Sequence, residues 1–180
     1  EYVTDTITDK ALGFLDELSQ EDAPFYLSVH YTSPHSPWDE DQHPVDVYSR
    51  YDGCSFSATP DLPLNKHQVK SAPYGEGEER KRLLRGYYSA ITAMDEGIGK
   101  ILSSLEDKGL QEDTIVIFSS DNGMNMGHHG IWGKGNGTFP LNMYDTSVKV
   151  PMIISWKGHI APRVSHTMLS HYDLFPTILE

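Results

Sequence analysis

Oxygen-bearing side chains that follow an apolar run are the most informative feature of this sequence. Residues 114–118, Thr-Ile-Val-Ile-Phe, are β-branched and apolar, which predicts a buried strand. Asp121 and Asn122 follow it, and Gly123 then permits a tight turn. Open α/β sheets bind their ligands just beyond the carboxyl ends of such strands. Two adjacent oxygen donors there suit a hard divalent cation, and Lys134, between two glycines, suits an anion.

A histidine follows a second predicted strand, over residues 25–31. His35 stands between Pro34 and Pro37, which stiffen the backbone that carries it. If strands 25–31 and 114–118 are parallel, His35 reaches the sheet edge that carries Asp121 and Asn122. The structural alternatives are an Asx turn at Asp121, a histidine with only a structural role, and a solvated surface lysine at position 134.

Helices at both ends and in the middle of the chain would hold these strands. Apolar residues at helical spacing predict amphipathic helices over 4–19 and 78–107, and a third helix begins near Ser170 with Asp173 as a plausible cap. Gly97 and Gly99 would each cost the middle helix about 1 kcal/mol against alanine, so we expect close packing at both. With a further strand inside 148–156, limited by Pro151, the order of elements predicts an α/β fold with a mixed, largely parallel sheet flanked by helices. No domain boundary is visible in residues 1–180.

The segment from Thr32 to Gly77 is rich in proline, glycine and aspartate, with one short helical piece near 46–51. Loops of this length are usually functional or covering elements. Trp38, Tyr48 and Tyr51 stand near its start and suggest a pocket for part of a substrate, because sugar rings stack well on aromatic side chains.

Composition excludes several classes of function. The net charge of −12 argues against nucleic acids and anionic membranes as partners, since both need basic patches. No apolar run approaches the ~20 residues of a membrane span. Cys54 is the single cysteine, which rules out an internal disulfide framework and a cysteine-rich zinc site. Because the chain starts at Glu1 and stops in what looks like mid-helix, we expect it to be a piece of a longer protein.

Several motifs, in order, resemble the sulfatases of the alkaline phosphatase-like superfamily. The resemblance covers nearly the whole chain, with only about residues 39–77 unaligned. The motifs that carry it are Pro24–Leu27 running into Pro34–Trp38, Tyr87–Tyr88 through Ile98–Gly99, Ser119–Gly123 with Gly127–Gly130 and Gly133–Gly135, Tyr144–Asp145 through Val148–Pro151, and Ser170–Thr177.

The resemblance implies a role for each candidate residue. Asp121 and Asn122 correspond to two ligands of the divalent metal, while His35 and Lys134 correspond to the catalytic pair that grips the sulfate and its bridging oxygen. His129 corresponds to a substrate-binding position beside the site. An all-oxygen ligand set favours Ca²⁺, with Mg²⁺ possible, over zinc. Protonated His35 or Lys134 could stabilise or protonate the departing alkoxide.

Two family features are missing from these residues. Sulfatases make a formylglycine nucleophile from Cys or Ser in a Cys/Ser-x-Pro-Ser-Arg motif, and they use an early Asp-Asp pair for the metal. Cys54 lacks the proline and arginine, so we interpret it as an ordinary thiol. The chain therefore corresponds to the C-terminal portion of a sulfatase catalytic domain without its nucleophile region, and by itself should be inactive. The resemblance also implies a periplasmic or secreted protein.

The leading hypothesis is metal-dependent hydrolysis of sulfate monoesters by the full enzyme, with a sulfated small molecule or carbohydrate as substrate. A phosphoester or phosphonate hydrolase of the same superfamily is the first alternative, although those relatives commonly have Asp-His where this chain has Asp121-Asn122. A non-catalytic binding module with the same fold is the second alternative. The sequence does not indicate an oligomeric state.

Overall fold

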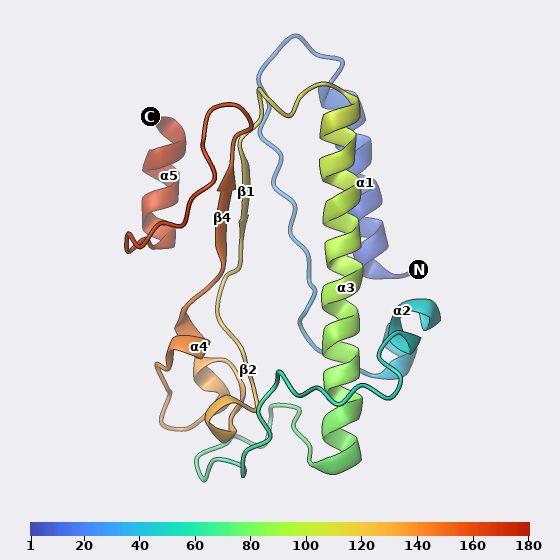
Figure 1. Ribbon diagram of the computed structural model, residues 1–180, viewed down its shortest axis with the longest axis vertical. Coiled ribbons are helices and arrows are strands. Elements are labelled where there is room, and N and C mark those ends of the chain that lie inside the picture. The colour runs from blue at the N-terminus through green and yellow to red at the C-terminus, as the bar shows by residue number, and fades with distance from the viewer.

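Two long helices form one side of the molecule in the computed structural model, which describes residues 1–180 (Figure 1). Helix α1 spans Val3–Leu18 and helix α3 spans Gly77–Asp107, close to the predicted 4–19 and 78–107. The buried side of α1 has helical spacing and faces α3; it consists of Thr4, Thr8, Ala11 and Leu15. Hydroxyls on this side are satisfied locally, since Thr8 Oγ1 lies 2.8 Å from Thr4 O and 2.8 Å from the Tyr31 hydroxyl.

The two glycines inside α3 differ in their surroundings. A Cβ atom on Gly97 would collide with Thr8 Oγ1 and would lie 2.9 Å from the Tyr31 hydroxyl oxygen. The prediction of close packing is therefore confirmed at Gly97. It is wrong at Gly99, where a Cβ atom would meet no atom within 4 Å.

The sheets of this chain are small and antiparallel. Strand β1 (Val116–Ser119) pairs with β4 (Met152–Ser155), and β2 (Asn125–Met126) pairs with β3 (Trp132–Gly133). The α/β class is confirmed, but the prediction of largely parallel pairing does not hold among these residues. The predicted strand over 148–156 begins only after Pro151, because a short helix, α4 (Asp145–Val148), occupies the preceding residues.

Residues 25–31 are extended but belong to no sheet. Their side chains alternate between half-buried and exposed, as in a strand with one covered face. No backbone hydrogen bond joins them to another segment, so the prediction of an extended segment was right, but this chain does not contain the parallel pairing on which the expected approach of His35 to Asp121 and Asn122 was conditional. Figure 1 shows this segment between α3 and β1, running in the same direction as β1.

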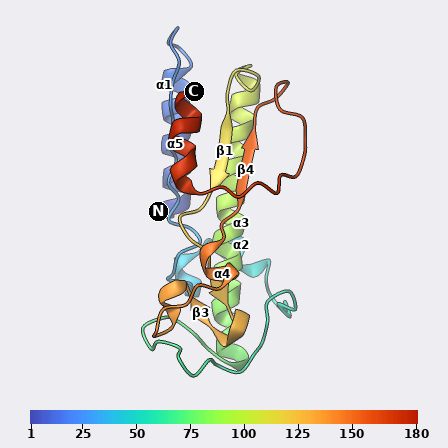
Figure 2. The ribbon, with the colours of Figure 1, turned by 90° about the vertical axis from the view of Figure 1, so that its left-hand side faces the viewer.

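The core at the other end of the molecule joins three parts of the chain. Its members are Trp38, Phe56, Leu83, Leu84, Met126 and Trp132. They come from the long loop, from α3 and from the β2–β3 hairpin, so this cluster fixes the hairpin against the helix. Figure 2 shows the loop between α2 (Val45–Ser49) and α3 passing beneath the hairpin.

Helix α5 (His171–Leu179) ends the chain and has no buried residue. Ser170 and Asp173 form a capping box at its start, which confirms the predicted cap. No helix of the structure combines the length and the apolar character that a membrane crossing requires.

Candidate active site

Asp121 and Asn122 precede strand β2, and Lys134 follows its partner strand β3. In the antiparallel register Asn125 lies opposite Gly133, so Lys134 directly follows a residue that is paired with β2. Asn125 begins strand β2, and Asn122 lies three residues before it. Because paired strands lie about 4.8 Å apart, the metal-ligand candidates and the lysine emerge at the same end of the hairpin. The Lys134 side chain is half-buried there.

Asn125 is a buried polar residue that holds this arrangement together. Its side chain is fully shielded from water, and its amide nitrogen donates to Gly133 O at 3.0 Å and to Ser147 Oγ at 2.7 Å. Its amide oxygen accepts from Thr146 Oγ1 at 2.5 Å. This role could not be predicted from local sequence, because the partners of Asn125 lie 8 to 22 residues away along the chain.

Asn142 supports the backbone of Lys134 from the other side. Its amide nitrogen lies 3.3 Å from Lys134 O and 3.1 Å from Gly135 O, and both carbonyls accept from it. Its amide oxygen accepts from Ser147 Oγ at 2.5 Å. The two asparagines therefore share Ser147, and together they fix the main chain on both sides of the lysine.

Asn122 and Asp121 present oxygen atoms that suit a hard cation. The Asn122 amide nitrogen donates to Gly123 O at 2.9 Å, and its amide oxygen accepts no hydrogen bond. Asp121 is exposed and carries only a long contact of 3.5 Å from Ser120 Oγ. No three His, Cys, Asp or Glu side chains of this chain converge on one point that could hold a metal. These two residues fit part of an all-oxygen metal site and cannot complete one.

His35 lies on a separate segment from the hairpin. Its Nδ1 is 2.9 Å from Ser36 O, and since a carbonyl can only accept, Nδ1 carries a hydrogen and Nε2 is left free. The Trp38 indole donates to Pro34 O at 2.9 Å, which closes the loop around the histidine. No hydrogen bond or ion pair joins His35 to Lys134 or to Asp121, so the structure does not by itself bring the histidine to the hairpin.

The substrate-binding role of His129 stays a prediction, and in the structure its side chain contacts Tyr144. Its ring stacks on Tyr144 with a centroid separation of 4.0 Å and an interplanar angle of 11°. Its backbone is in the left-handed region at φ 58°, and its carbonyl accepts from Asn65 Nδ2 at 3.3 Å. Burial, helped by the charge of His129, lowers the pKa of the adjacent His128.

A cavity of about 350 Å³ opens next to the His35 loop. Its lining includes Ser36, Trp38, Tyr74 and an ion-pair group in which Arg82 bonds both Asp39 and Glu79. Trp38 therefore borders a pocket, as predicted. Tyr48 and Tyr51 do not: Tyr48 is buried beneath the Arg85 guanidinium, and the Tyr51 hydroxyl lies 2.6 Å from Thr92 Oγ1.

The sulfatase family model matches residues 1–180, the whole chain. The chain belongs to the sulfatase family. It is 29% identical over 160 residues to an endo-4-O-sulfatase of Bacteroides thetaiotaomicron, covering 87% of this chain and 28% of that protein. It is 27% identical over 177 residues to mouse (Mus musculus) iduronate 2-sulfatase, covering 86% of this chain and 30% of that protein.

A solved structure confirms the fold of this sulfatase chain. The crystal structure of a putative sulfatase, yidJ, from Bacteroides fragilis superposes with a TM-score of 0.79 at 29% identity, covering 99% of this chain and 36% of that one. The sulfatase chain thus spans about a third or less of the relatives that it matches. Sulfatases are sulfuric ester hydrolases, and metal binding and formylglycine are general features of the family.

Proposed function

We propose that the full-length protein hydrolyses sulfate monoesters of carbohydrates, and that these 180 residues supply part of its active site. The observation that supports the proposal is the register of the β2–β3 hairpin, in which Lys134 follows one strand and Asp121 and Asn122 precede the other, at the same end. A lysine ammonium group and two metal-ligand oxygens at one end of a hairpin would suit an anion such as a sulfate ester.

Each residue has a distinct task in this proposal. Asp121 and Asn122 would hold Ca²⁺, or Mg²⁺, together with ligands from the rest of the protein. The bound metal would act as a Lewis acid toward the sulfate oxygens. Lys134 would donate hydrogen bonds to the ester, and its main chain is already fixed by Asn125 and Asn142. The formylglycine nucleophile would come from outside these residues.

His35 would donate a proton to the alkoxide that leaves the sulfate. With Nδ1 donating to Ser36 O, only Nε2 is available to the substrate, so proton donation requires the imidazolium form. The adjacent cavity with Tyr74 and Trp38 on its wall offers apolar surface to a sugar ring, and the carboxylates of Asp39 and Glu79 offer acceptors to its hydroxyls. These contacts support a carbohydrate as the alcohol portion of the ester. We also propose that the enzyme works in the periplasm or outside the cell.

The test is a comparison of substrates on the full-length, matured enzyme. We expect release of sulfate from 4-nitrophenyl sulfate and from sulfated sugars, with a much lower kcat/KM for 4-nitrophenyl phosphate and for a phenylphosphonate ester. Higher kcat/KM on the phosphorus esters would favour the phosphonate hydrolase alternative. Binding of a sulfated sugar without turnover, in protein confirmed to carry formylglycine, would favour the non-catalytic module.

A further inference from the structure

Several long stretches of this acidic protein contain no carboxylate side chain, and two of them contact each other in the fold. Residues 62–75 and residues 122–144 have neither Asp nor Glu, although the whole chain has 26 of them. The same stretches hold Lys66, Lys70 and Lys134, together with three histidines, at positions 67, 128 and 129. We call these two stretches the acid-free lobe.

The fold joins the two stretches directly. Asn65 N donates to Gly130 O at 2.8 Å, and Val69 N donates to Gly137 O at 2.9 Å. The Gln68 side chain accepts from Trp132 N and donates to Trp132 O, both at 2.9 Å. The lobe is therefore one connected surface, and it carries Lys134 of the proposed active site.

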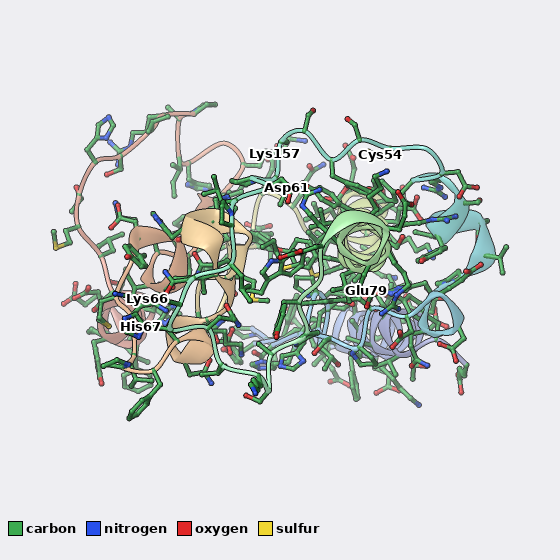
Figure 3. The ribbon with its side chains drawn as sticks, turned by 90° about the horizontal axis from the view of Figure 1, so that it is seen from below. Cys54, Asp61, Lys66, His67, Glu79 and Lys157 are labelled. Carbon is green, nitrogen blue, oxygen red and sulfur yellow. The ribbon has the colours of Figure 1, made fainter.

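The positive charge of the lobe is not neutralised within the chain. Lys66, Lys70 and Lys134 form no ion pair, and Lys66 and Lys70 are exposed. Four carboxylates border the lobe in the sequence: Asp61 lies 3.3 Å from Arg80 and Asp145 lies 2.6 Å from Lys149, whereas Glu76 and Asp121 form no ion pair. Figure 3 shows Lys66 and His67 beside the hairpin segment, with Asp61 and Glu79 set apart from them.

A cavity of about 170 Å³ lies within the lobe. Asn65, His67, Asn142 and Tyr144 line it, and Tyr144 is the residue on which His129 stacks. Asn142 also donates to Lys134 O, so this cavity and the lysine share a supporting residue. The cavity thus presents polar side chains and an aromatic side chain, and Lys66 lies between two of its lining residues in the sequence.

We infer that the acid-free lobe is a second anion subsite, which binds a further sulfate group on the same carbohydrate chain whose ester is hydrolysed. This inference rests on the proposed function for the class of substrate. Lys66, which lies in the sequence between the lining residues Asn65 and His67, and the unpaired Lys70 attract a sulfate, while the polar cavity receives the sugar that bears it. A polysulfated saccharide fits this surface better than nucleic acid does, because the lobe has only three lysines on a chain with net charge −12.

The experiment removes two charges from the lobe of the full-length enzyme. Lys66→Ala with Lys70→Ala is compared with Lys10→Ala and Lys100→Ala, which remove the same charge from unpaired lysines on α1 and α3. The substrates are a disaccharide with one sulfate and the same disaccharide with two. We expect the lobe variant to lower kcat/KM for the disulfated compound by roughly two- to fivefold per lysine, the range for exposed charge pairs. Activity on the monosulfated compound should be unchanged.

Several outcomes would overturn the inference. One is an equal effect on both compounds, another is no effect on the disulfated one, and a third is the same loss in the α1 and α3 control. The preference of the wild type for the disulfated compound should also weaken as salt is raised.

Binding separates this inference from the proposed function. Calorimetry measures the affinity of wild type and lobe variant for the disulfated disaccharide without any need for turnover. If the enzyme releases no sulfate but the lobe variant binds the compound more weakly, the proposed function fails and the subsite stands. If both proteins bind it equally, the subsite fails whether or not the enzyme is active.

Discussion

Asn125 and Ser147 are joined by a hydrogen bond of 2.7 Å, and both side chains are buried. Through this bond the hairpin that holds Lys134 is tied to helix α4, which precedes strand β4. Ser147 O in turn accepts from Gly123 N at 3.1 Å, so the same segment also fixes the turn after Asn122. The relative positions of the metal-ligand candidates and the lysine therefore depend on one polar contact between segments 22 residues apart.

Asn125→Ala should destabilise the protein and disturb the site. The substitution removes the hydrogen bonds of Asn125 to Thr146, Gly133 and Ser147, of which only Ser147 keeps another side-chain partner, Asn142, and each lost bond of this kind costs about 1–3 kcal/mol. Urea unfolding monitored by circular dichroism measures the change. Asn136→Ala is the matched control, since Asn136 is exposed on the same hairpin extension, and it should change stability by less than about 0.5 kcal/mol. Equal stability of the two variants would remove Asn125 from this role.

Gly97→Ala and Gly99→Ala should change stability in opposite directions. Both changes improve helix propensity, by about 0.5–1 kcal/mol, but only position 97 lacks room for a methyl group beside Thr8 and Tyr31. We expect Gly99→Ala to raise the melting temperature of the full-length enzyme. Gly97→Ala should lower it, because overpacking costs about 1–3 kcal/mol. A rise in both variants would mean that α1 moves away from α3 without penalty.

Asp121→Ala should lower metal content and activity together. It removes a negatively charged oxygen donor from the proposed metal site, so excess calcium in the assay should restore part of both. Metal analysis of the purified enzyme and titration of activity with calcium measure the effect. Asp113→Ala, at the opposite end of β1, is the control of equal charge change and should keep its metal. Full activity of Asp121→Ala with normal metal content would exclude this residue as a ligand.

His35→Ala should cost more on poor leaving groups than on good ones. Loss of one preorganised electrostatic contact typically raises the barrier by about 2–4 kcal/mol. A nitrophenolate needs little protonation, so kcat/KM should fall least for an aryl sulfate and most for an alkyl or sugar sulfate. The ratio of kcat/KM for the two substrates, wild type against variant, is the measurement. An unchanged ratio would leave His35 as a sulfate binder only. Lys134→Ala should lower kcat/KM for both substrates by the same factor.

His43→Phe should remove part of the pH dependence of stability. Burial lowers the pKa of His43 despite the opposing charges of Asp39 and Asp41, and both ring nitrogens are buried without a partner. The unfolded chain therefore binds the proton more readily than the folded one, so stability rises with pH up to the ordinary value of 6.5 and falls below it. Phenylalanine keeps the stacking on Tyr48. Urea midpoints of wild type and variant should diverge as pH falls toward about 5; parallel curves would contradict the assignment.

Local patterns were enough to predict most helices. The boundaries of α1, α3 and α5 lie within two residues of those expected from spacing and capping, because these signals are contained in neighbouring residues. The pairing of strands was not predictable in the same way. Residues 25–31 have the alternation of a strand, but alternation does not say which segment supplies the hydrogen bonds, and none in this chain does.

The candidate site was also predictable only in part. Residue types and order indicated Asp121, Asn122, Lys134, His35 and His129, and the hairpin register puts the first three at the same end of the hairpin. The supporting asparagines at 125 and 142 escaped notice because an asparagine in a loop is usually a turn residue. Their function depends on contacts with segments that only the folded chain brings near.

The Gln68 amide behaves toward Trp132 as a peptide group of a neighbouring strand would, accepting and donating with one side chain. The loop before α3 is thereby fastened to the hairpin by a side chain and a few main-chain bonds, at Asn65, His67, Gln68 and Val69. Lys66, the one residue between these fastening points, makes no hydrogen bond to the hairpin. If the acid-free lobe binds substrate as proposed, exchange of Lys66 would change the substrate preference without disturbing the attachment of the loop.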